Sequence, residues 1–116
     1  MSGAKDRVRL CHMLESAREA VELMQGKGRP DLDSDRLLGL ALARLLKMIG
    51  DAANRVSPEY RSAHAAVPWS GIDDLRDHLI EEYYAVDLDL LWKVFNQDLP
   101  DLVGELETII LREGGT

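Results

Sequence analysis

The sequence is poor in several residue types, and each shortage excludes a class of protein. Cys11 is the single cysteine among 116 residues, so the chain has no internal disulfide and no thiolate cluster for zinc. No stretch approaches the ~18 apolar residues that a membrane-spanning helix needs. The amino-terminal segment carries charged residues from Lys5 onward and lacks the apolar stretch of a secretory signal. We therefore expect a cytoplasmic protein without a membrane association or a bound metal.

Basic residues are also fewer than acidic residues. Lys and Arg total 14 against 21 Asp and Glu, which gives a net charge of −7. Because non-specific affinity for nucleic acid comes from neutralising phosphates with Lys and Arg, a broad nucleic-acid surface is not expected. DNA is not an expected partner, and any chemistry on nucleic acid would need a local site.

The apolar residues that are present recur at helical spacing. Leu38, Leu42, Leu45 and Ile49 step alternately by four and three, and no segment alternates with period two for long. With a length typical of one domain, 1–116 is expected to form an all-α, up-down four-helix bundle. The expected helices are 5–25, 34–56, 70–84 with Ser70 as its cap, a short extra helix over 58–64, and a last helical region from Leu88 that is interrupted at Leu99-Pro100.

Two groups of residues could suggest a metal site, and neither has the required pattern. Asp31 to Asp35 resembles the opening of a calcium loop, but that loop needs Gly at its sixth position and Glu at its twelfth, where this chain has Arg36 and Leu42. We interpret these acids as helix caps. His12, His64 and His78 lack the i, i+4 spacing of paired metal ligands. No metal and no cofactor is expected.

The third predicted helix and the turn after it carry the candidate chemistry. Arg76 and Tyr83 lie two turns apart on one flank near the end of this helix, with Glu81 close by. The pattern alone favours a surface ion pair beside a half-buried tyrosine over a functional site.

Several separate segments together resemble one known family. Over residues 7–112 their order and spacing are similar to those of the HepT family of HEPN-domain proteins. The segments are 34–38 (SDRLL), 49–58 (IGDAANRVSP), 67–69 (VPW), 75–77 (LRD), 82–87 (EYYAVD), 91–92 (LW) and 98–100 (DLP).

The resemblance implies a HEPN-like domain with a core at about 5–112 that forms a homodimer. It further implies the toxin of a two-gene pair whose antitoxin is an MntA-like nucleotidyltransferase. Such toxins are metal-independent RNA endonucleases with a composite site at the dimer interface. Their signature is Arg, four residues, His, one residue, Tyr. The imidazole would deprotonate the ribose 2′-hydroxyl while the guanidinium holds the phosphate, and the antitoxin adds AMP to the tyrosine.

When the family signature is aligned with this sequence, Arg76 matches the arginine and Tyr83 matches the modified tyrosine. Glu81 occupies the position of the histidine. His78, two residues after Arg76, is not an obvious stand-in. The catalytic candidates are therefore Arg76 and, in place of histidine, Glu81. Residues that are expected to line the site are Arg44, Lys47, Asp77 and His78.

Lys47 marks a second departure, because the family commonly has an acid at this position. We hypothesise that Lys47 and Glu81 form a replacement ion pair, the alternative being that two solvated positions drifted independently. A glutamate with a pKa near 4.3 is a weak base at neutral pH, so RNA cleavage is expected to be weak or lost. The alternative function is a catalytically degenerate dimer that binds protein or RNA.

Overall fold

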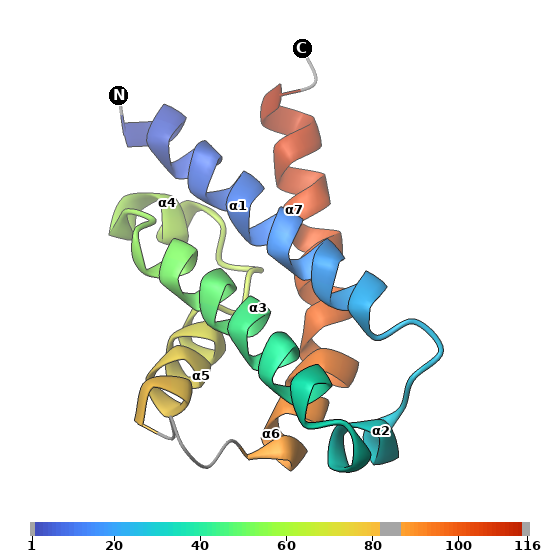
Figure 1. The fold of residues 1–116 in the computed structure, drawn as a ribbon. Coiled ribbons are helices and arrows are strands. Elements are labelled where there is room, and N and C mark those ends of the chain that lie inside the picture. The colour runs from blue at the N-terminus through green and yellow to red at the C-terminus, as the bar shows by residue number, and fades with distance from the viewer. Residues whose placement is uncertain (1, 82–86, 115–116) are drawn as a thin grey trace.

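The computed structural model describes residues 2–81 and 87–114, and this part of the chain is helical with no strand (Figure 1). The all-α prediction is therefore confirmed. The elements are α1 (Ser2–Leu23), α2 (Arg29–Ser34), α3 (Arg36–Asn54), α4 (Pro58–Ala63), α5 (Trp69–Glu81), α6 (Leu88–Lys93), the π-helical segment η1 (Val94–Asp98) and α7 (Leu99–Gly114).

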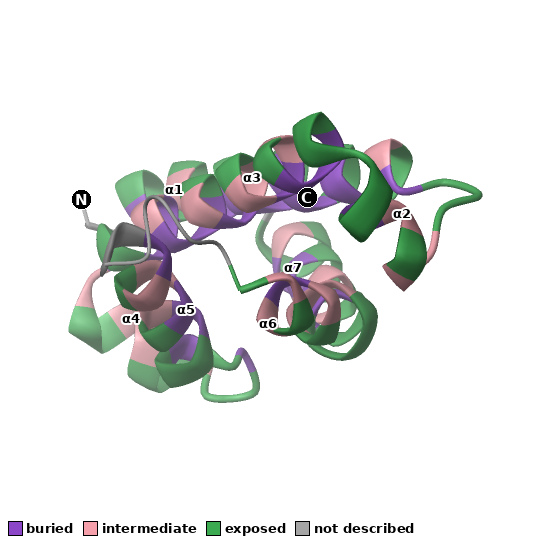
Figure 2. Ribbon diagram, turned by 60° about the horizontal axis from the view of Figure 1, so that its bottom comes forward, coloured by how far each residue is buried: buried purple, intermediate pink, exposed green. Residues whose placement is uncertain are grey.

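The four longest helices alternate in direction along the chain, as an up-down bundle requires (Figure 1). Helix α3 is central, with α1 packed antiparallel along one side and α5 against the other, while α7 packs against α1. Figure 2 shows buried residues on the inner sides of α1 and α3 and exposed residues on their outer sides. Helices α1 and α3 thus form one layer, and α5 and α7 lie on its buried side (Figure 2).

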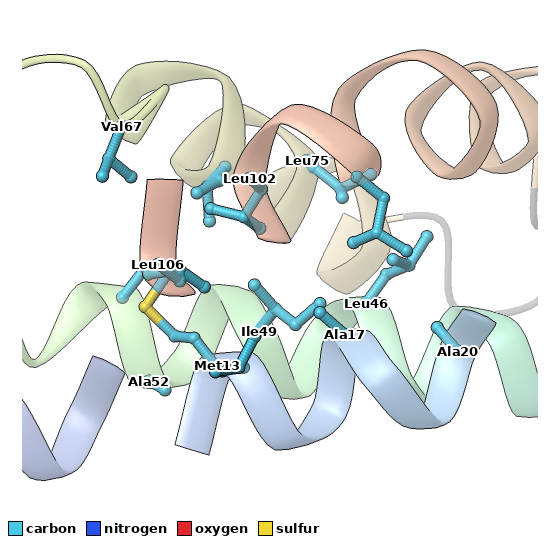
Figure 3. Packing of buried hydrophobic residues seen from close by; sticks show 14 of the residues in the cluster. Met13, Ala17, Ala20, Leu46, Ile49, Ala52, Val67, Leu75, Leu102 and Leu106 are labelled. Carbon is cyan, nitrogen blue, oxygen red and sulfur yellow. The ribbon is translucent and has the colours of Figure 1, made fainter. Parts of the chain in front are cut away.

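Aliphatic side chains from every long helix fill the space between α7 and the α1–α3 pair (Figure 3). The predicted stripe of α3 is confirmed at Leu38, Leu42 and Ile49, which are buried. Its fourth member, Leu45, is only partly buried, and the neighbouring Leu46 is buried instead. The largest side chains with almost no exposure are Leu10, Met13, Leu32, Leu42, Leu46, Leu91, Leu99 and Leu106.

The segment before α3 was predicted as a cap but forms a helix of its own. Pro30 lies in the first turn of α2, where its missing N–H breaks no helical bond. The carboxylate of Asp31 accepts a hydrogen bond from the backbone N–H of Gly28 at 2.6 Å. Only Asp35 caps α3, by accepting from the N–H of Leu38 at 3.2 Å, so this helix starts at Arg36.

Helix α5 begins one residue earlier than predicted, and Ser70 is not its cap. The carbonyl of Pro68 accepts from the N–H of Ile72 at 3.1 Å and closes the first turn. The indole N–H of Trp69 donates to the carbonyl of His64 at 3.0 Å, which fixes the start of the helix. The predicted end at 84 lies outside the described residues.

The last helical region is interrupted as predicted, but the interruption takes another form. It is the five-residue π-helical segment η1, which ends before Leu99. Pro100 follows η1 without a break, since the chain is helical from Leu88 to Gly114 and the N–H of Leu99 still donates to the carbonyl of Val94. A proline inside a helix has no N–H to donate and crowds the preceding turn, and the wider π-helical turn directly before Pro100 accommodates it.

A buried carboxylate ties α1 to the start of α4. Asp6 is 3% exposed and accepts hydrogen bonds from the backbone N–H of Ser57 at 2.9 Å and from its hydroxyl at 2.7 Å. The same hydroxyl caps α4 by accepting from the N–H of Tyr60 at 3.3 Å. Since Ser57 follows α3 directly, this contact fixes the register of α1 against α3.

Candidate active site on α3 and α5

Helices α3 and α5 approach each other most closely where Gly50 faces Arg76. A Cβ placed on Gly50 would lie 2.6 Å from the Cβ of Arg76 and 3.2 Å from its Cγ. Carbon atoms pack at roughly 3.5–4 Å, so a glycine is required at this crossing. The aliphatic part of Arg76 consequently lies flat against α3.

The guanidinium of Arg76 is held by an acid on the neighbouring helix. Its Nε donates to Asp51 Oδ1 at 2.7 Å, and Lys47 Nζ donates to the other oxygen, Oδ2, at 3.0 Å. Asp77 Oδ1 is 3.8 Å from Nη1, and among the described residues no hydrogen-bond partner lies at Nη2. An arginine that is anchored through Nε and keeps its terminal nitrogens available is suited to bind a phosphate.

This ion-pair network shifts the pKa of both partners. Partial burial raises the pKa of Asp51, but the hydrogen bonds from Arg76 and Lys47 outweigh it, so the net pKa is below the ordinary value. The hydrogen bond to Asp51 raises the pKa of Arg76. Both groups therefore stay charged at neutral pH, and the negative charge of Asp51 is offset by two cations.

Acid should weaken the fold through Asp51. Because its folded pKa lies below the ordinary value of 3.8, its stabilising contribution is present above that value and is lost as pH falls through the folded pKa. Urea unfolding at pH 7 and at pH 3 should show that Asp51→Asn loses less stability on acidification than the unmodified protein. Equal losses in both proteins would contradict a structural role for this carboxylate.

Of the other residues that were predicted to line the site, only Asp77 lies beside Arg76. Asp77 is exposed beside Arg76. His78 faces a hollow of about 300 Å³ between α5 and η1, where its Nε2 is buried and has no hydrogen-bond partner among the described residues. Arg44 lies about two turns before Asp51 and borders a separate hollow between α1 and α3 with Glu19 and Glu22.

The structure accounts for Lys47 in a way that the sequence did not suggest. Its ammonium pairs with Asp51, one turn later on the same helix. The backbone of Glu81 ends α5, whereas its side chain and the whole of Tyr83 lie outside the described residues. The Lys47–Glu81 ion pair stays a prediction.

Asp51 is the site residue that sequence reasoning missed, although it lies in a segment that carried the family resemblance. The available signal was an acid four residues after Lys47 and next to a helix-interior glycine. That signal does not reveal which helix packs against it, so the partner Arg76 could not be identified.

Among residues 4–79 and 87–113, whose side chains the structure describes, no three His, Cys, Asp or Glu residues cluster in a way that could hold a metal ion. None of the helices in these ranges is both long and apolar enough to cross a membrane.

An all-α bundle that presents an anchored arginine on its surface has the features of a HEPN-type helical protein. A family model described as ribonuclease HepT-like matches residues 13–109. The chain belongs to this HepT-like family, which confirms the resemblance.

Curated relatives agree with this assignment. The chain is 32% identical over 102 residues to "Putative RNase TTE0752" of Caldanaerobacter subterraneus subsp. tengcongensis, covering 88% of this chain and 91% of that protein. It is 33% identical over 100 residues to "Probable ribonuclease HepT" of Thermococcus cleftensis, covering 83% of this chain and 91% of the relative. No solved structure matches the chain.

Proposed function

We propose that this protein is the toxin of a HepT-like toxin–antitoxin pair and cleaves RNA without a metal at a composite site in its homodimer. The observation that carries the proposal is the anchoring of Arg76 by Asp51 at 2.7 Å, which leaves Nη2 for a phosphate. Membership of the HepT-like family and the ribonuclease names of its relatives support the substrate class. The symmetric partner would bring a second Arg76 to the same cleft.

The proposed reaction is an internal transesterification. A base takes the proton of a ribose 2′-hydroxyl, whose oxygen then forms a bond to the adjacent phosphorus as the bond from phosphorus to the 5′-oxygen breaks. The 5′-oxygen takes up a proton, and the products are a 2′,3′-cyclic phosphate and a 5′-hydroxyl. Arg76 would neutralise the charge that develops on the phosphate oxygens. Glu81 occupies the position of the base and would perform this role weakly at neutral pH.

Arginine substitution tests this function directly. In buffer with EDTA, the purified protein should cleave single-stranded RNA slowly, and Arg76→Ala should lower the rate by about 10²-fold or more because the developing charge loses its partner. Arg76→Lys keeps the charge but not the forked geometry and should restore little. Arg36→Ala, which changes an exposed arginine at the start of α3, is the matched control. Cleavage that is unaffected by Arg76→Ala would show that another site, or a contaminant, is responsible.

One observation favours a second candidate function. With Glu81 where the family has histidine, a dimer that binds RNA or a protein without cleaving it is the alternative. RNA binding without any cleavage product would support it.

Regulation is proposed to follow the family. An MntA-like nucleotidyltransferase would add AMP to Tyr83, seven residues after Arg76, and would block the site. Intact-mass analysis after co-expression with such an enzyme should show added AMP that is lost with Tyr83→Phe. An unchanged mass would reject this regulation and leave the cleavage proposal standing.

A further inference from the structure

A polar groove runs between α1 and α3 on the outer surface, next to the Arg76 site. It has a volume of about 290 Å³, and Arg9, His12, Asp51 and Arg55 are among the residues that line it. The Asp6–Ser57 bonds fix the antiparallel register, which places the Arg9 end of α1 beside the Arg55 end of α3 (Figure 1). The groove therefore has a basic end.

The two arginines of this end are not neutralised within the described part of the molecule. Among residues 4–79 and 87–113, whose side chains the structure describes, no carboxylate lies within ion-pair distance of Arg9 or Arg55, whereas Arg76 of the neighbouring site has such a partner. Arg9 is half-buried, while Arg55 and His12 are exposed. Two cations that border one groove repel each other, and a bound anion would relieve this repulsion.

The acids of the groove lie toward its other end. Glu15 and Glu19 are six and ten residues after Arg9, which corresponds to about 9 and 15 Å along the helix axis, and Glu15 is one turn after His12. The groove is thus basic at one end and acidic at the other. An anionic strand would occupy only the end with Arg9, His12 and Arg55.

Asp51 connects this basic end to the Arg76 site. It lines the groove and also accepts the hydrogen bond from Arg76. Arg55 is one helical turn, about 6 Å along the axis, after Asp51. Because Lys47 and Arg76 offset the charge of Asp51, this carboxylate does not repel a strand that passes over it. Two cationic positions, Arg76 and the Arg9–Arg55 pair, thus flank one neutralised acid.

We propose that Arg9, His12 and Arg55 form a second phosphate-binding subsite, which holds the RNA backbone beside the phosphate at Arg76. The inference rests on the proposed function for the identity of the strand. The subsite explains how an acidic chain binds RNA, because the cations are concentrated along one path. It also defines the path of the strand over the surface, which runs from α5 across α3 to α1.

The test is the salt dependence of binding to a strand that cannot be cleaved. A fluorescein-labelled 2′-O-methyl oligoribonucleotide is titrated by anisotropy over a range of salt. Each phosphate contact with a single strand contributes a slope of about 0.7 to the plot of log K against log salt. The double variant Arg9→Gln/Arg55→Gln should flatten this slope by about 1.4, and glutamine keeps most of the side-chain stem that packs in the groove.

Arg36→Gln/Arg112→Gln is the matched control, because it removes the same charge from two exposed arginines outside the groove. It should leave the slope unchanged, and equal slopes in the two double variants would overturn the subsite. So would failure of the unmodified protein to bind the strand at any salt concentration.

The outcome is independent of the cleavage assay. A flattened slope in a protein that does not cleave RNA would establish the subsite and reject the ribonuclease. If cleavage depends on Arg76 but the two double variants have equal slopes, the ribonuclease is established and the subsite is rejected.

Discussion

Glu81→His is expected to raise the rate of RNA cleavage by about 10²- to 10⁴-fold, the usual contribution of a well-placed general base. A glutamate with an ordinary pKa is almost fully ionised at pH 7 and has little affinity for the proton of a hydroxyl group. An imidazole titrates near neutrality, and the substitution removes one negative charge from the proposed site. Single-turnover cleavage of a labelled RNA measures the gain.

The controls separate a restored base from a simple change of charge. Glu81→Gln removes the same charge without supplying a base and should give only a small gain. Glu81→His in the Arg76→Ala background should give little activity, because the phosphate is then not held. If the unmodified protein already cleaves RNA as fast as Glu81→His, the histidine is dispensable and the expectation of weak activity is wrong.

Gly50→Ala is expected to lower the free energy of unfolding by about 1–3 kcal/mol, the typical cost of overpacking. The added methyl would lie 2.6 Å from the Cβ of Arg76, so α5 must move away from α3. The movement would also lengthen the contact between Arg76 and Asp51 and reduce RNA cleavage. Urea unfolding measures the first effect and the cleavage assay the second.

Gly104→Ala is a control with the opposite expected sign. Gly104 also lies inside a helix, α7, but nothing lies within 4 Å of a Cβ added there. Alanine favours the helix by about 0.5–1 kcal/mol relative to glycine, so this variant should be slightly more stable. A destabilisation of the same size at both positions would show that the close approach of Arg76 is not the cause.

The sequence predicted the parts of this fold that depend on local pattern. The alternating steps of four and three through Leu42 and Ile49 indicated the central helix, and both side chains are buried. Helix α2 was missed because its six residues are too short to display a period. Pro100 indicated where the last helical region departs from α geometry, but the sequence did not show that the departure takes the form of a π-helical segment before the proline.

The site was less accessible to prediction, because its geometry depends on contacts between distant residues. Arg76 was identified by resemblance, yet its anchor Asp51 is 25 residues away in sequence. The contact of Lys47 with Asp51, one turn later on its own helix, was not predicted, and the proposed pair with Glu81 stays a prediction. Periodicity identifies which face of a helix is buried, but it does not show which residue of the next helix lies opposite.

The bond between Asp6 and Ser57 has a consequence for how the molecule forms. It closes a loop of 51 residues, and the entropy of such a closure must be overcome before the contact contributes to stability. Helices α1 and α3 are therefore expected to acquire their final register late, after α4 has been capped. Amino-terminal changes that disturb Asp6, which lies in the first turns of α1, would alter the alignment of the groove between α1 and α3.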